Sequence, residues 1–160
     1  MFYKDPNTHE IRNLTEKEAR FFGGLISAIS NGNLAFVQKA LPAQPFLAHA
    51  FDDKGFSALN IAASCYTPEG LESVRILIQY GADPYLENED GFSAIDNVND
   101  ITDINLRNSF CDAMGIDHDT QAVLRQIHRA KATKIVEAEY AAKAAEEAAR
   151  KAELDAEIDR

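Results

Sequence analysis

The chain has 160 residues, 46% of them hydrophobic, which is enough for one domain with a modest core and an appendage. Its net charge of −10 disfavours binding to nucleic acid or to an anionic membrane surface, because both recruit Lys and Arg. No stretch approaches the roughly 20 apolar residues of a membrane span, and the N-terminus lacks the apolar run of a secretory signal, so we expect a cytoplasmic protein that does not bind membranes.

The first predicted element is a short helix that begins near residue 16. Thr15 and Glu18 have the spacing of a capping box, in which each side chain accepts a hydrogen bond from the backbone amide of the other residue. The next segment, LISAISNGNLAFVQKAL, has apolar residues at helical spacing and predicts a helical pair over residues 25–41. Pro42 and Pro45 then favour a loop.

A five-residue pattern then occurs twice. Residues 55–59 read GFSAL and residues 91–95 read GFSAI, a step of 36 residues from Gly55 to Gly91. Between the two copies, small residues at 62 and 63 allow helices to approach closely, and residues 74, 77 and 78 form an apolar stripe on a second helix. Gly81 suits the positive φ that ends such a helix. A unit of this kind buries its stripe only by stacking on a neighbour.

This pattern resembles the ankyrin repeat, a unit of about 33 residues. The matching positions are Gly55, Leu59, Ala62, Ala63, Leu71, Val74, Leu77, Ile78, Gly81, Ala82 and Asp83. The family's Thr-Pro-Leu-His is replaced by Ser-Ala-Leu-Asn at residues 57–60, and extra residues before Leu71 predict a lengthened turn. The resemblance covers residues 23–115. It implies an all-α, ankyrin-type helical solenoid of two to three degenerate helix-turn-helix repeats with loop or hairpin tips.

The C-terminal segment has a different composition. Residues 117–160 contain no Gly or Pro and predict a long charged Ala-rich helix, capped by Asp119 or Thr120, after an N-terminal cap and ankyrin-repeat domain at residues 1–116. Three interpretations of this helix stay open. It is a cap that continues as a solvated rod, a surface for a homodimer, or a partner-binding or targeting tail.

No pattern typical of catalysis is present. No two of the four histidines stand at i,i+3 or i,i+4, Cys65 and Cys111 form no Cys-x-x-Cys, and no glycine-rich phosphate loop occurs. His118 and Asp119 could pair as a base and its orienting acid, but an acid at a helix start better fits a cap. We therefore expect no enzyme, no cofactor, no metal site and two reduced thiols.

The resemblance instead implies protein binding at the repeat tips and along the inner helices. The predicted contact residues are Asp53, Lys54 and Phe56 at one tip, Glu87, Glu89, Asp90 and Phe92 at the next, and Asn60, Ser64 and Cys65 on an inner helix. Carboxylates at the tips predict a protein partner with a basic surface and exclude nucleic acid. Phe56 and Phe92 are either exposed anchors or pack between repeats.

The expected function is therefore that of a protein-protein interaction adaptor. Two alternatives remain. In the first, the chain is a structural or assembly protein whose C-terminal helix mediates self-association. In the second, it is a secreted bacterial effector that acts on a host protein in the host cytosol, because its Glu-rich C-terminus loosely resembles the tails of some such effectors.

Overall fold

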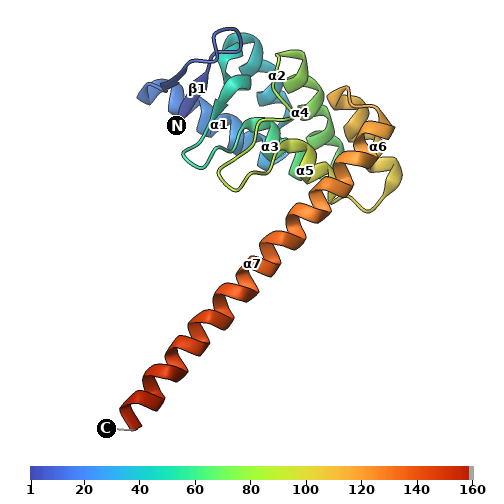
Figure 1. The fold of residues 1–160 in the computed structure, drawn as a ribbon. Coiled ribbons are helices and arrows are strands. Elements are labelled where there is room, and N and C mark those ends of the chain that lie inside the picture. Colours follow the sequence, from blue (N-terminus) through green and yellow to red (C-terminus); the bar gives the residue numbers. More distant parts are fainter. Residues whose placement is uncertain (159–160) are drawn as a thin grey trace. The chain divides into compact units, whose positions relative to one another are not determined.

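The computed structural model describes residues 1–158, and the chain divides into a compact unit, residues 1–124, and a helical unit from Arg125 onward. The described residues form seven α-helices, one 3-10 helix and a small three-stranded sheet (Figure 1). The prediction of a mostly helical chain with a long C-terminal helix is confirmed.

Six helices of the compact unit form three successive hairpins. Each of the inner helices α1, α3 and α5 packs against the outer helix that follows it, α2, α4 or α6. In addition, α3 contacts both α1 and α5, and α4 contacts both α2 and α6, so the hairpins stack in two layers (Figure 1). The bounds are α1 Glu16–Ser30, α2 Leu34–Ala43, α3 Ala58–Ser64, α4 Pro68–Gln79, α5 Ala94–Asn99 and α6 Ile104–Met114.

The core lies between these layers and follows the predicted apolar positions. Leu59, Val74 and Leu77 are fully buried, as are the small residues Ala62 and Ala63 on α3. Because alanine has a short side chain, α3 packs closely against helices on both sides. Burial of large aliphatic side chains, at about 1.5–3 kcal/mol each, is the main force that holds one hairpin on the next.

Two expectations for the N-terminal region are corrected. The short helix expected near residue 16 and the first inner helix are one continuous helix, α1, whose capping box between Thr15 and Glu18 is confirmed. The fold is also not entirely helical. Strand β1 (Phe2–Lys4) pairs in antiparallel fashion with β2 (Ile11–Asn13) and with β3 (Ala50–Phe51), which follows the 3-10 helix η1 (Pro45–His49).

Side-chain contacts explain why these strands form. The carboxylate of Asp5 accepts hydrogen bonds from the amides of Asn7 and Thr8 at 2.8 and 2.9 Å and so folds the turn between β1 and β2. Phe2 stands opposite Phe51 in the β1–β3 pair, and the two rings stack at 5.6 Å between centroids. Segments that are far apart in the sequence are thus joined in one sheet at the start of the stack.

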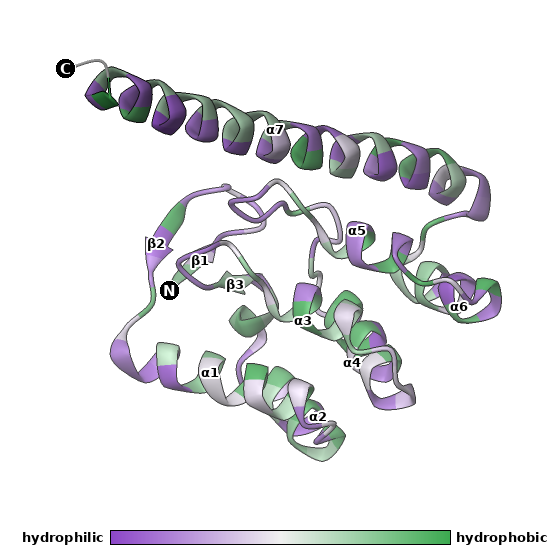
Figure 2. Cartoon of the chain, turned by 90° about the horizontal axis from the view of Figure 1, so that it is seen from below, coloured by the Kyte–Doolittle hydropathy of each residue, from purple (hydrophilic) through white to green (hydrophobic). Residues whose placement is uncertain are grey.

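Helix α7 (His118–Ile158) makes up the C-terminal segment. Its N-terminus is capped by Asp117, not by Asp119 or Thr120 as expected, because the Asp117 carboxylate accepts hydrogen bonds from the amide and hydroxyl of Thr120 at 2.8 and 2.6 Å. Residues 133–158 are exposed, and Figure 2 shows hydrophilic turns along this helix with hydrophobic ones at intervals. Among residues 1–158, no helix combines the length and apolarity needed to cross a membrane.

Candidate functional site

The two predicted tips have the same turn. In the first, the Asp52 carboxylate accepts hydrogen bonds from the amides of Lys54 and Phe56, both at 2.9 Å, and the Asp52 amide donates to the Phe56 carbonyl. In the second, the Asn88 side-chain oxygen accepts from the amides of Asp90 and Phe92, both at 3.0 Å, and the Asn88 amide donates to the Phe92 carbonyl. A short polar side chain that folds its own backbone gives both tips one shape.

The tips also lie side by side. The amide of Glu89 donates to the carbonyl of Lys54 at 2.9 Å, which joins one tip to the other. Gly55 has φ +83°, and a Cβ atom added to it would lie 2.9 Å from Cα of Asn88. Glycine is therefore required here both by the positive φ and by the close approach of the second tip.

We call the surface of these two turns the tip surface: Asp53, Lys54, Phe56, Glu87, Glu89, Asp90 and Phe92. Its four carboxylates and its lysine are exposed, as predicted. Asp53 has a partner that the sequence did not reveal, because the N-terminal amine of Met1 lies 2.6 Å from its carboxylate. This ion pair is exposed and holds the chain start beside the first tip.

Phe56 lies at the edge of a small hollow between this tip and the inner helices. The hollow has a volume of about 130 Å³ and is lined by Met1, Phe22, Gly23, Ile26, Asp52, Phe56 and Ile61. Phe56 and Phe92 are both half-buried, so neither projects freely as an anchor and neither is lost to the core. The tip surface therefore has an acidic rim next to an apolar depression.

The three predicted inner-helix residues differ in accessibility. Asn60 is only 2% exposed, and its side-chain oxygen completes a capping box with Ser57 at the start of α3, so the expectation that it contacts a partner is corrected. Ser64 is exposed, and its hydroxyl donates to the carbonyl of Ile61 at 2.7 Å. Cys65 is half-buried at the end of α3, where burial raises the pKa of its thiol.

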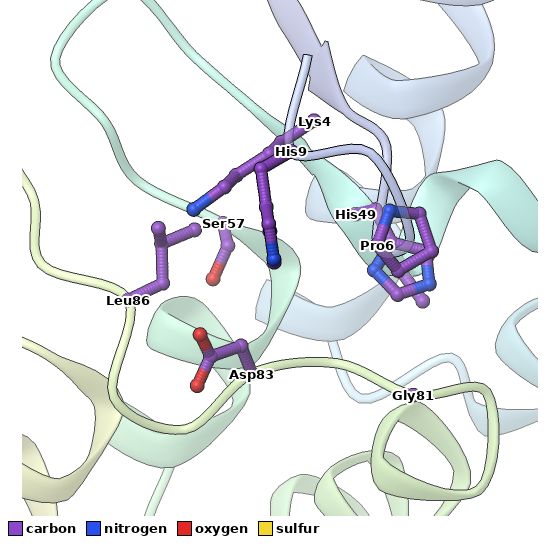
Figure 3. A pocket seen from close by; sticks show the side chains of 9 residues that line it. Lys4, Pro6, His9, His49, Ser57, Gly81, Asp83 and Leu86 are labelled. Carbon is purple, nitrogen blue, oxygen red and sulfur yellow. The ribbon is translucent and has the colours of Figure 1, made fainter. Parts of the chain in front are cut away.

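A second hollow, of about 180 Å³, lies where the β1–β2 turn meets α3 and the end of α4 (Figure 3). Lys4, His9 and Asp83 place their charged or polar ends toward it, and His49 and Pro6 also line it. Burial lowers the pKa of His49, which keeps this imidazole neutral. This hollow was not predicted from the sequence, since its residues come from segments far apart in the chain.

Two further reactive side chains, Cys111 and His118, lie outside these hollows. Burial raises the pKa of the Cys111 thiol to about 11, so it stays protonated at neutral pH. His118 lies 2.9 Å from the carboxylate of Asp112, not that of Asp119, and this pair is exposed. Within residues 1–158, no group of three or more His, Cys, Asp or Glu side chains is placed to hold a metal ion.

Comparison of the chain with models of protein families, with curated proteins and with solved structures found no match.

Proposed function

We propose that this chain is a protein-interaction module of the ankyrin-repeat type, which binds a protein partner with a basic surface through the tip surface. The observation that carries the proposal is the pair of identical turns, hydrogen-bonded to each other between Glu89 and Lys54, which fixes two sets of charged side chains in register. A rigid arrangement of this kind binds with little loss of conformational entropy.

The repeat arrangement supports the assignment to the ankyrin type. Helical hairpins stack with their inner helices in one layer and their outer helices in another, and Gly55 and Gly91 occupy equivalent positions with φ of +83° and +78°. The two successive inner helices α3 and α5 both begin with a capping box, at Ser57 and Ser93. Units that repeat at this level of detail are typical of solenoids, whose usual function is protein binding.

The chemistry of the tip surface supports a basic partner. The tip surface has four exposed carboxylates and one exposed lysine. The Asp53 carboxylate already pairs with one cation, the N-terminal amine. The adjacent hollow offers room for an apolar side chain beside Phe56. A small, charged and largely exposed surface predicts fast, salt-sensitive association of modest affinity. The two free thiols fit a reducing compartment, and we place this function in the cytoplasm.

The test is affinity capture from cell lysate with the intact chain and with the variant Glu87→Lys/Glu89→Lys/Asp90→Lys. A matched control, Glu10→Lys/Glu137→Lys/Glu139→Lys, makes the same change of net charge at exposed positions outside the tip surface. We expect the intact chain and the control to capture the same partner, with the affinity falling as salt is raised. The tip variant should lose that partner while keeping its helical content.

Two outcomes would contradict the proposal. If the tip variant and the control both retain the partner, the tip surface is not the binding site. If both lose it equally, net charge alone explains the capture. Phe56→Ala is a further test. Loss of its ring from the hollow should lower the affinity for a specific partner and leave nonspecific charge attraction unchanged.

A further inference from the structure

A second surface with the opposite character lies on the first hairpin of the stack. Between α1 and α2 there is a groove of about 560 Å³, lined by Lys17, Arg20, Phe21, Gly24 and Phe36. It shares no residue with the tip surface or with the two hollows described above. Its function is therefore a separate question from that of the tips.

The floor of the groove is aromatic. Phe21 and Phe36 leave 37% and 38% of their surface exposed, which is high for phenylalanine. A Cβ atom on Gly24 would lie 3.5 Å from Cζ of Phe36, an ordinary van der Waals distance, so the Phe36 ring lies against α1 at this glycine. A flat apolar floor of this kind gains free energy when another apolar surface covers it.

The rim of the groove is basic. Lys17 and Arg20 are both exposed, in a chain whose net charge is −10. Arg20 has a local partner, Glu16, at 3.2 Å, but this pair is almost fully exposed and contributes little. The groove thus favours an occupant that combines apolar side chains with carboxylates.

The last turns of α7 have that combination. Leu154 and Ile158 stand at i,i+4 on the helix and are 57% and 73% exposed. Acidic residues at 153, 155 and 157 flank them, and residues 153–158 contain no basic residue. This segment presents an apolar pair with a negative border, where the groove presents an apolar floor with a positive border.

We propose that residues 153–158 of one chain dock in the α1–α2 groove of a second copy. Such a contact is heterologous, because it joins two different surfaces. It closes if two chains exchange segments reciprocally or if several copies form a ring, and otherwise it forms open chains. The surface is small, so the affinity is modest and self-association depends on concentration. This inference does not rest on the adaptor function proposed above, since it uses none of the residues of the tip surface.

The first test is sedimentation velocity over a concentration series of the full chain, compared with the variant Leu154→Ser/Ile158→Ser. Both positions are exposed on the helix surface, so the variant should fold like the original chain. We expect the original chain to associate as its concentration rises and the variant to require at least about ten times the concentration, since a lost buried aliphatic side chain changes a binding constant by roughly that factor.

The second test addresses the groove with two matched arginines. Arg20 on α1 and Arg75 on α4 each pair with an acid of their own helix, at 3.2 and 3.0 Å, but only Arg20 lines the groove. Arg20→Glu should weaken association and Arg75→Glu should not. Mixing Arg20→Glu with a Glu153→Lys/Glu157→Lys chain should restore association, because each variant then meets a surface of opposite charge.

The proposal is overturned if the original chain stays monomeric at all concentrations. It is also overturned if the Leu154/Ile158 variant associates as strongly as the original, or if Arg20→Glu and Arg75→Glu behave alike. None of these results depends on a captured partner, so failure here and failure of the tip surface are distinguishable.

Discussion

Glu18 links the N-terminal strands to the first helix. Its two carboxylate oxygens accept hydrogen bonds from the Arg12 guanidinium at 2.9 and 3.0 Å, and one of them also accepts from the Thr15 amide at 2.8 Å. Arg12 in turn lies over the ring of Tyr3, 4.8 Å from its centroid. These contacts lower the pKa of Glu18 to about 2. The hydrogen bonds from Arg12 are the largest cause, and the hydrogen bond from the Thr15 amide is the next.

We therefore predict that Arg12→Ala raises the pKa of Glu18 toward the ordinary value of about 4.3. The carboxylate is favoured in the folded state, so its contribution to stability is present above the ordinary pKa and is lost as the pH falls toward 2. Without Arg12, stability should vary less with pH in this range. An NMR titration of the side-chain carboxyl carbon measures the shift. Arg20→Ala is the control, because Arg20 contacts Glu16, and it should leave Glu18 unchanged.

At the scale of elements, the packing of one tip on the other makes a prediction about two glycines. Gly55 and Gly115 have φ of +83° and +71°, but a Cβ atom on Gly55 would meet the backbone of Asn88, whereas one on Gly115 would meet nothing within 4 Å. Gly115→Ala should therefore cost only the backbone strain, about 1–2 kcal/mol. Gly55→Ala adds overpacking and should cost about 3 kcal/mol or more.

Urea unfolding followed by circular dichroism measures both free energies of unfolding. If the two glycine variants lose the same free energy of unfolding, the tips do not pack together as described. The charged side chains of the tip surface would then not be held in a fixed register. A larger loss for Gly55→Ala, with the two helical contents unchanged, supports that register.

Some features that depend on the chemistry of a few adjacent residues could be predicted from the sequence. The capping box of α1 and the positive φ of Gly81 each depend on a few adjacent residues and were predicted correctly. The lengthened turn expected before Leu71 shows the limit of such predictions. Pro68 and Gly70, which precede Leu71, lie in the first turn of α4, where proline suits the first position and a Cβ atom on Gly70 would clash with the Cys65 carbonyl oxygen.

Several of the features that sequence reasoning missed join distant segments. The three-stranded sheet brings residue 2 next to residue 51, and the N-terminal amine reaches Asp53. The hollow beside Phe56 needs residues from the chain start, α1 and α3 together. The tip carboxylates could be predicted because solvated residues in a turn obey local rules, whereas the burial of Asn60 depends on the helices packed around it.

Across the whole molecule, stability should be unevenly distributed. The compact unit contains the buried core, whereas residues 133–158 are exposed and their helix is maintained by its own backbone hydrogen bonds and Ala-rich composition. At low protein concentration we predict that hydrogen exchange is slowest for amides in α3 and α4, near the limit of global unfolding, and fast for residues 137–158.

Raising the protein concentration separates the interpretations of α7 in the same experiment. A solvated rod exchanges at the same rate at every concentration. If residues 153–158 dock in the groove of a second copy, protection should rise with concentration in two places, the end of α7 and the α1–α2 hairpin, and should disappear in Leu154→Ser/Ile158→Ser. Protection that rises along α7 without any change at α1 and α2 would mean that the helices pair with each other, which would contradict docking and leave the groove without an occupant.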